Sequence, residues 1–311
     1  MKISNEIPRA LGMLLICLVY SCVCFSKTKN LSHAIIAPYA FEQCADVVFI
    51  GEQKKTFNPD SVKFGSVVAM HGSDVPYFFK HYNSKIMHPY IILTFGEYRD
   101  AFQESYIVYL ENEKIISWFG VHPFPFTHPK FIPLPLGIKI KTHNAQKIKK
   151  KDRLFTRLRN RSKKKLVYLN FALNNPQRKL VRNLLKDSPF CFVSDRLKNK
   201  GRLSFYAYLK EMASCVFTVS PPGNGPDSYR TWESIMVGSI PIVEHSQLDQ
   251  LYEDLPVLVI DNWEQITEEF LQKKSVEFSS HVFNIEKMYM SFWQKKINQI
   301  KNTYKNKREG A

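Results

Sequence analysis

Val216–Val243 reads VFTVSPPGNGPDSYRTWESIMVGSIPIV and predicts the fold of the chain. Its opening residues are apolar and rich in β-branched side chains, which is typical of a buried strand. The turn residues 220–226 follow, and Asp227 or Ser228 is placed to cap a helix that ends at Gly238. The closing residues predict a second strand. Strand, loop, helix and strand in so short a stretch indicate a parallel α/β sheet.

The turn and the start of this helix are suited to bind phosphate. A glycine-rich turn that opens a helix leaves several backbone N–H groups pointing one way, with the positive end of the helix dipole behind them. Arg230, in the first turn, adds a cation able to grip a phosphate with two hydrogen bonds. Glu233 lies on the same helical face and can accept hydrogen bonds from ribose hydroxyls. These groups suit a nucleotide diphosphate sugar; a surface ion pair between the two residues is the alternative.

The run Ser220–Val243 resembles the donor-binding segment of exostosin-like glycosyltransferases. Its residues SPPGNGPDSYRTWESIMVGSIPIV follow the order of that family's pattern, except that Pro222 stands where arginine is frequent. Upstream, Ser117–Ile138 looks like the stretch with which related two-domain enzymes end their first half. The resemblance covers roughly residues 65–275. It implies a GT-B-like α/β fold, in which two Rossmann-like domains face each other across a cleft and the second domain holds most of the nucleotide sugar.

The resemblance also implies the candidate donor-binding residues. The strand-like run 166–171 and the turn after it are expected to face the same cleft, so Arg178 is a second candidate cation for the diphosphate. An ordinary exposed helix face is the alternative for this arginine. The full donor-binding set is Ser220, Gly223, Asn224, Gly225, Asp227, Ser228, Arg230, Glu233 and Arg178.

Candidate catalytic bases lie in the first half of the chain. The strand-like run 65–72 leads to His71 and Asp74, and the run 91–95 leads to Glu97. Ligands of open α/β sheets bind beyond the carboxyl ends of strands, which is where an acceptor sugar would enter. An inverting transfer needs a base for the acceptor hydroxyl; Asp74 is the first candidate, and His71 and Glu97 are the next. Capping of the helix after Asp74 is the alternative, and both roles can hold.

The N-terminus carries an uncharged apolar run, Leu11–Phe25, with basic residues on both sides. This run fits a signal peptide or a short signal anchor, and its flanking charge does not decide its orientation. Glycosyltransferases of the secretory pathway commonly use such an anchor. We therefore expect a single-pass membrane protein with a lumenal catalytic domain in the Golgi or the endoplasmic reticulum if the source is eukaryotic. A bacterial envelope protein or a secreted protein is the alternative.

The length of 311 residues suffices for two modest domains. In GT-B proteins the last helix often crosses back onto the first domain. The predicted segments are a signal anchor or signal peptide with a stem at 1–30, an N-terminal acceptor-side Rossmann-like domain at 31–138, a basic interdomain segment at 139–165, a C-terminal nucleotide-sugar-binding Rossmann-like domain at 166–285, and one basic C-terminal helix at 286–311.

Positive charge is concentrated in the interdomain segment. Residues 139–165 hold thirteen lysines and arginines and one acid, Asp152, so twelve of the sixteen net positive charges lie there. A basic patch confined to this segment, without interleaved aromatic residues or a binding motif, argues against a nucleic-acid partner. A solvated linker helix, a site for an anionic acceptor glycan and contact with acidic lipid headgroups stay open.

Acidic and cysteine motifs for metal binding do not occur in the sequence. There is no D-x-D pair of the kind that holds a metal and a donor diphosphate in many GT-A glycosyltransferases, and the cysteines lack metal-ligand spacing. We therefore expect no metal and no cofactor, and backbone amides and arginines are expected to neutralise the diphosphate. P-loop, hydrolase and dinucleotide-binding motifs do not occur either.

Together these features predict a metal-independent, inverting glycosyltransferase, a hexosyl- or pentosyltransferase. Its partners would be a nucleotide sugar, with UDP as the expected nucleotide, a glycan acceptor that is anionic or neutral, and a membrane contacted through the N-terminal segment. A catalytically inactive, membrane-anchored glycan-binding protein of the same fold is the alternative. Binding of UDP distinguishes the two.

Overall fold

The computed structural model describes residues 35–96, 104–121, 123–140, 145–194 and 203–309. The predicted apolar segment Leu11–Phe25 and the candidate base Glu97 lie outside these residues. Among the helices that are described, none is both long enough and apolar enough to cross a membrane.

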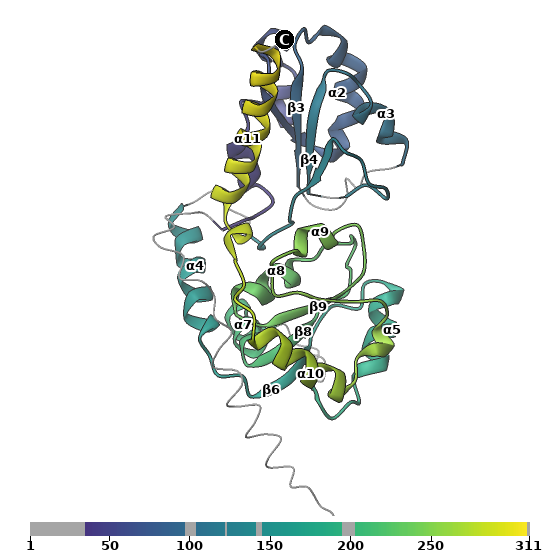
Figure 1. Ribbon diagram of the computed structural model, residues 1–311, viewed down its shortest axis with the longest axis vertical. Coiled ribbons are helices and arrows are strands. Elements are labelled where there is room, and N and C mark those ends of the chain that lie inside the picture. Colours follow the sequence, from purple (N-terminus) through teal and green to yellow (C-terminus); the bar gives the residue numbers. More distant parts are fainter. Residues whose placement is uncertain (1–34, 97–103, 122, 141–144, 195–202, 310–311) are drawn as a thin grey trace, which may run out of the picture.

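The first half of the chain forms a parallel sheet of five strands, in the upper part of Figure 1. Its elements are β1 (Val47–Phe49), β2 (Val67–His71), α2 (Val75–His81), β3 (Tyr90–Phe95), α3 (Ile107–Leu110), β4 (Ile115–Gly120) and β5 (Phe131–Pro133). The strands follow the order β1-β2-β3-β4-β5, and every neighbouring pair is parallel. Strands β3 and β4 are buried along their whole length, because a parallel sheet is covered on both faces.

The second half forms another parallel sheet of five strands, in the lower part of Figure 1. Its elements are β6 (Lys165–Leu169), α5 (Pro176–Leu185), β7 (Cys191–Val193), α7 (Phe205–Ala213), β8 (Cys215–Val219), α8 (Tyr229–Met236), β9 (Ile240–Glu244), α9 (Asp249–Tyr252), β10 (Leu258–Ile260) and α10 (Glu268–Ser279). The strand order is β10-β9-β8-β6-β7. The chain runs outward from β6 to β7 and then returns to the other side of β6 as β8, so the strand order reverses between β6 and β8. The protein is thus mixed α/β, and both sheets are compatible with a Rossmann-like fold.

One apolar cluster connects the two sheets. It contains Leu93 and Phe119 of the first sheet together with Trp232 and Met236 of α8. Leu136, in the connection that follows β5, belongs to the same cluster. The two halves therefore share a continuous core, and each sheet also packs a smaller cluster of its own.

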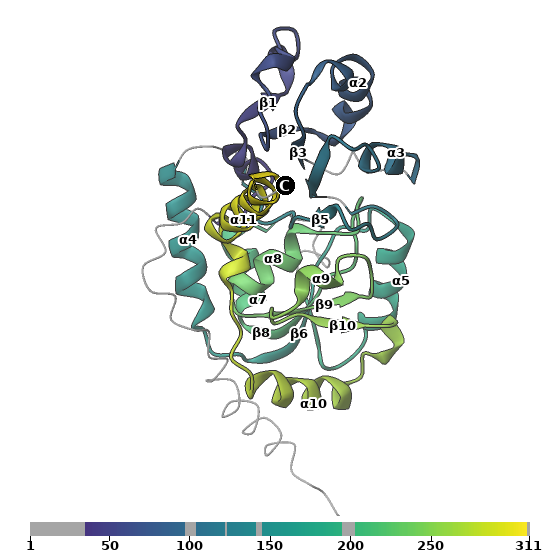
Figure 2. The ribbon, with the colours of Figure 1, turned by 45° about the horizontal axis from the view of Figure 1, so that its top comes forward.

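The basic interdomain segment contains α4 (Ala145–Arg159), at the left edge of Figures 1 and 2. Phe155 and Leu158 are buried in the shared core, so α4 packs through one face, and the solvated helix face that the sequence left open is its other face. Several of its cations do face solvent, namely Lys149, Lys150, Arg153 and Arg157.

The C-terminal segment returns to the first sheet, as the GT-B resemblance implied. The helix α11 (Met290–Glu309) places Trp293 against Phe41, with ring centroids 6.3 Å apart, and the Nζ atom of Lys301 lies 2.6 Å from Asp46 (Figure 1). The prediction of one continuous helix from residue 286 is wrong. Tyr289 is extended because it forms a β-bridge with Ile35, and so α11 begins after it.

Candidate functional site

A cavity of about 750 Å³ lies beyond the carboxyl ends of β6 and β8. The strand order reverses between these two strands, and doubly wound sheets bind ligands at such a reversal. The topology therefore places this cavity where the fold is suited to hold a ligand. Its lining residues are Leu136, Lys139, Asn170, Ala172, Asn174, Arg178, Leu203, Phe205, Tyr208, Gly223, Asn224, Gly225, Asp227, Ser228, Tyr229, Arg230 and Glu233.

The glycine-rich turn before α8 forms one wall of this cavity. The backbone N–H of Gly223 donates to the carbonyl of Gly225 at 2.8 Å, so its predicted role as a phosphate donor is wrong. Within the described part of the chain, the N–H groups of Asn224 and Gly225 have no protein acceptor. These two amides are therefore available to a ligand.

Arg178 holds the turn in place. Its Nε donates to the carbonyl of Pro222 at 2.7 Å and its Nη2 donates to that of Pro221 at 3.2 Å. Its Nη1 donates to the carbonyl of Ala172 and to Oδ1 of Asn174. These bonds use four of the five guanidinium N–H groups. Arg178 is buried, so it is not part of an exposed helix face, and burial together with the neighbouring Arg230 lowers its pKa to about 10.

The same arginine explains why a glycine occupies position 223. A Cβ atom at Gly223 would lie 2.9 Å from Nη2 of Arg178, a separation that real Cβ contacts do not show. The guanidinium cannot move aside without losing its bonds to the turn. Close approach of the backbone to Arg178 therefore requires glycine here.

Arg230 is the cation with the most remaining hydrogen-bonding capacity in the cavity. Its Nε donates to the carbonyl of Asn170 at 3.0 Å, and its guanidinium lies 5.5 Å from the ring centroid of Phe171. These contacts fix the plane of the guanidinium. Among the described residues, no acceptor bonds either Nη atom, so both can bind an anionic ligand.

Glu233 lies one helical turn after Arg230 and is 4% exposed. Its Oε2 accepts a hydrogen bond from the hydroxyl of Tyr208 at 3.0 Å. Burial raises the pKa of Glu233 to about 7, against the opposing effects of Tyr208, Arg230, Lys151 and Lys139. The alternative of a surface ion pair is wrong, because the carboxyl is buried and no salt bridge joins these two described residues.

Asp227 fixes the start of α8 and joins it to the first half. Its carboxylate accepts hydrogen bonds from the N–H groups of Leu136 and Ser228, at 2.8 and 2.7 Å, and from Nε1 of Trp232 at 2.8 Å. It is buried, and desolvation raises its pKa to about 7. Asp227 lines the cavity, but both of its carboxylate oxygens already accept hydrogen bonds from the protein.

Ser220 and Ser228 lie around the first turn of α8. The hydroxyl of Ser220 lies 3.0 Å from that of Ser228 and 2.8 Å from that of Thr231. Ser228 occupies the N-cap position, as predicted, but its side chain makes no capping hydrogen bond because it faces Ser220 instead. Ser220 is not among the residues that line the cavity, so we place it beneath the site as a support for the helix.

The two described candidate bases of the first half, Asp74 and His71, lie elsewhere. Asp74 occupies the N-cap position of α2 without a side-chain capping bond and instead pairs with Lys54, while its second oxygen is buried without a protein partner among the described residues. The ring of His71 contacts Phe95 and Tyr39. Neither Asp74 nor His71 lines the cavity.

Several residues of the cavity were missed by reasoning from the sequence. Tyr208 lies on α7 and its hydroxyl donates to Glu233, and Asn170 directly follows the last residue of β6. Lys139 enters from the basic segment, and its Nζ lies 5.6 Å from the ring centroid of Tyr229. Their signals in the sequence are weak, because Lys139 is one of thirteen cations in its segment and Tyr208 resembles an ordinary helix residue.

In the described part of the chain, no group of three or more histidine, cysteine, aspartate or glutamate residues is placed to hold a metal ion. The described cysteines, Cys44, Cys191 and Cys215, are free thiols.

Comparison with known proteins identifies the family. The family model described as the RXYLT1 C-terminal domain matches residues 148–307, which include β6 to β10 and the whole of the glycine-rich turn and α8. No curated protein matches the chain. The family match covers half of the chain and contains every described lining residue of the cationic cavity except Leu136 and Lys139. The chain belongs to the family of the RXYLT1 C-terminal domain, an exostosin-like glycosyltransferase family.

Proposed function

We propose that the protein is a glycosyltransferase that moves a sugar from a UDP-sugar donor to a hydroxyl of a glycan. Family membership supports the class of reaction. The observation that carries the proposal is the cavity at the strand reversal, where Arg230, Glu233 and open backbone amides line one wall. We further propose that the two parallel sheets form a GT-B arrangement around this site, which the return of α11 to the first sheet supports.

The diphosphate would bind at the start of α8. Among the described residues, neither Nη atom of Arg230 donates to a protein acceptor, so both can bind the diphosphate. The amides of Asn224 and Gly225 precede the same helix, at its positive end. Lys139 and the remaining N–H of Arg178 add positive charge. As the bond between the sugar and the diphosphate breaks, these groups would stabilise the charge on the leaving group without a metal.

The nucleoside would be held by Glu233. Its carboxylate can accept hydrogen bonds from two ribose hydroxyls, and the hydroxyl of Tyr208 orients it. Because burial raises its pKa to about 7, this binding would need the carboxyl to lose its proton first.

An inverting transfer needs a base from the first half of the chain. The acceptor oxygen would attack the anomeric carbon, and its proton would pass to the base while the diphosphate leaves. Asp74 remains our first candidate, because Lys54 holds one of its oxygens and the other has no protein partner among the described residues. His71 and Glu97 remain the alternatives. We also propose that Leu11–Phe25 anchors the protein in a membrane with the catalytic part in the lumen.

Thermal unfolding of the full-length chain with and without UDP, each measured with and without a chelator, tests this function. UDP should raise the Tm of the wild type, because it binds only the folded state. Arg230→Ala should weaken UDP binding roughly 10- to 100-fold, since a charged hydrogen bond contributes about 1.5–3 kcal/mol. Arg153→Ala, on the exposed face of α4, is the matched control and should bind UDP normally.

Glu233→Ala completes this experiment, with the exposed Glu269→Ala as its control. Full stabilisation of Glu233→Ala by UDP would refute the role of this carboxyl. A wild type that ignores UDP would refute the enzyme and favour a glycan-binding protein. Loss of UDP binding on chelation would refute metal independence alone.

A further inference from the structure

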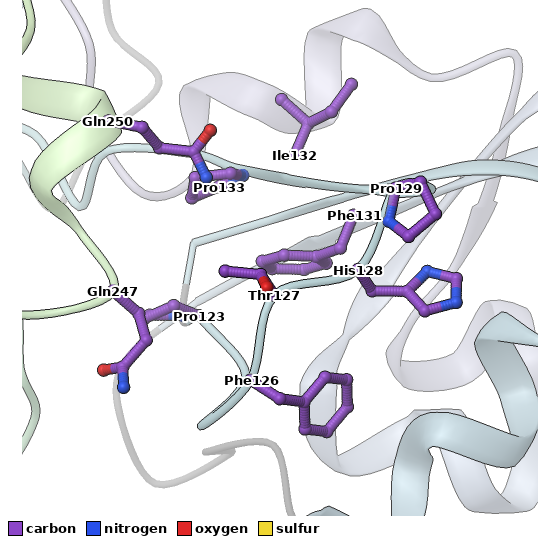
Figure 3. Close-up of a pocket in the computed structure, with 10 residues that line it drawn as sticks. All are labelled: Pro123, Phe126, Thr127, His128, Pro129, Phe131, Ile132, Pro133, Gln247 and Gln250. Atoms are coloured by element: carbon purple, nitrogen blue, oxygen red, sulfur yellow. The ribbon is translucent and has the colours of Figure 1, made fainter.

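A second cavity, of about 400 Å³, lies between the two halves of the chain (Figure 3). Its walls come from the loop after β4, from β5, from the segment between β9 and α9, and from α9 itself. Both β4 and β9 belong to parallel sheets and point their carboxyl ends to these walls, the end at which such sheets bind ligands. The lining residues are Pro123, Phe126, Thr127, His128, Pro129, Phe131, Ile132, Pro133, Gln247 and Gln250.

The chemistry of this cavity differs from that of the cationic one. Among the described residues, no lysine, arginine, aspartate or glutamate lines it, whereas the cavity at α8 is lined by Lys139, Arg178 and Arg230. In Figure 3, Gln247 and Gln250 lie on one side of the cavity and Thr127 and Phe131 on the other. Aromatic and proline rings offer apolar surfaces, and two amides and a hydroxyl offer hydrogen-bond donors and acceptors. A neutral ligand with both apolar C–H faces and hydroxyl groups fits such walls.

The aromatic side chains of this cavity wall are held in place by contacts with other rings. Phe126 stacks on the buried ring of Phe124, with centroids 5.0 Å apart and an interplanar angle of 24°. Phe124 in turn contacts Phe131 at 4.7 Å and Trp118 at 5.3 Å. Rings that are fixed in advance lose little conformational entropy on binding, which favours weak ligands such as sugars.

The two cavities are neighbours along the chain. Pro133 lines the neutral cavity and Leu136 lines the cationic one, and three residues of backbone span at most about 11 Å. The N–H of Leu136 is held by Asp227 at the start of α8, so this spacing is fixed by a buried hydrogen bond. One short oligosaccharide can therefore reach from the neutral cavity towards the cationic one.

We propose that the neutral cavity binds a pyranose ring of the acceptor glycan, an assignment that rests on the proposed glycosyltransferase function. A C–H face of the ring would lie on Phe126, and Gln247 and Gln250 would bind its hydroxyls. The acceptor unit in this cavity is uncharged, because the described lining residues include no lysine or arginine to pair with a carboxylate or phosphate, and Nδ1 of the lining His128 accepts a hydrogen bond from the N–H of Lys130 at 3.2 Å.

Saturation-transfer difference NMR on the full-length chain tests the proposal. The probes are the methyl glycosides of glucose, galactose, mannose and N-acetylglucosamine, with methyl glucuronide as the charged contrast. At least one neutral glycoside should give signals that are strongest for the protons of one C–H face, and methyl glucuronide should give weaker ones. UDP binding is measured on the same samples.

Two variants locate the binding. Phe126→Ala should weaken the sugar about tenfold, as the loss of an aromatic anchor does. The double variant Gln247→Ala/Gln250→Ala should act in the same direction and keeps the fold intact, because both side chains are exposed. Gln272→Ala, an exposed glutamine on α10, is the control. Both test variants should bind UDP like the wild type.

The possible results separate the inference from the proposed function. Sugar signals that are lost in both test variants, with UDP binding retained, support the acceptor site. Signals that survive both variants, an absence of signals from every probe, or a preference for methyl glucuronide overturn the inference while the UDP result stands. Failure of UDP to bind overturns the proposed function, and the assignment of an acceptor falls with it.

Discussion

Burial of the Glu233 carboxyl makes its charge depend on pH near neutrality. Burial raises the pKa of Glu233 to about 7. At a pH between the ordinary carboxyl pKa and about 7, this carboxyl is therefore protonated in the folded protein and ionised in the unfolded chain. In this window the folded state binds more protons, and the contribution of Glu233 to stability therefore falls as pH rises. Hydrogen bonds from ribose hydroxyls would offset the free-energy cost of burying the ionised carboxylate only while the nucleoside is bound.

Binding of the nucleoside should consequently depend on pH. We expect the affinity for uridine to rise as pH increases through about 7 and then to level off, with a slope of at most about tenfold per pH unit below the pKa. Uridine is the suitable probe because it has no phosphate whose own ionisation would interfere. Calorimetric titrations at several pH values measure the effect, and Glu233→Gln should give a flat profile. A wild-type profile as flat as that of the variant would contradict the proposed contact.

At the scale of elements, the C-terminal ends of α7 and α8 meet at one buried lysine. The Nζ atom of Lys163 donates to the carbonyl of Ala213 at 2.9 Å and to that of Val237 at 3.4 Å. Lys163 is 6% exposed, and desolvation lowers its pKa to about 7. The unbonded carbonyls at two helix ends are thus satisfied by a group from the basic interdomain segment.

Lys163 gives a second dependence on pH, of opposite sign. Between about 7 and the ordinary lysine pKa the unfolded chain holds a proton that the folded protein lacks, so this contribution to stability rises with pH. The difference in unfolding free energy between wild type and Lys163→Met should increase by up to about 1.4 kcal/mol per pH unit in this window. Urea denaturation at several pH values measures it, with the exposed Lys164→Met as control. A constant difference would show that Lys163 keeps its charge on folding.

The local elements around the site could be predicted from the sequence because their signals are local. The apolar run 216–219, the turn and Gly238 fix a strand, a loop and a helix end within a few residues of each other. The contacts of Arg178 could not be predicted in this way. Whether that guanidinium faces a ligand or the carbonyls of Pro221 and Pro222 depends on how two distant turns approach, and the same holds for the N–H of Gly223.

At the scale of the whole molecule, α11 packs against the residues that precede the first strand. Trp293 is 2% exposed, contacts Phe41, and donates from Nε1 to the carbonyl of Lys287 at 2.9 Å. It belongs to the cluster that joins both sheets. Loss of this one side chain should therefore affect the stability of the entire fold.

Trp293→Ala should lower the free energy of unfolding by about 3–5 kcal/mol, the usual cost of removing a large buried aromatic side chain. Because the core is shared, circular dichroism and tryptophan fluorescence should report one coincident transition at a lower urea concentration. Gln294→Ala, the exposed neighbour, is the control. Two separate transitions in the wild type would show instead that the halves unfold independently.

The architecture could be predicted from the sequence in part. The strand-like runs and the motif indicate two α/β units, and both sheets form. Charge alone could not show that α4 packs through Phe155 and Leu158, or that Lys139 enters the cavity, because these placements depend on the neighbouring elements. The contacts between the halves, such as that of Asp227 with Leu136, likewise join residues far apart in the chain.

The return of α11 to the first sheet has a consequence for synthesis in the cell. The strands of the first half leave the ribosome before α11, whose Trp293 packs against Phe41. Until α11 has been synthesised, the first half lacks this cover, and chaperones would find exposed apolar surface there. A premature stop codon shortly before Met290 would spare every described residue of the cationic cavity and still remove α11, the helix that covers Phe41.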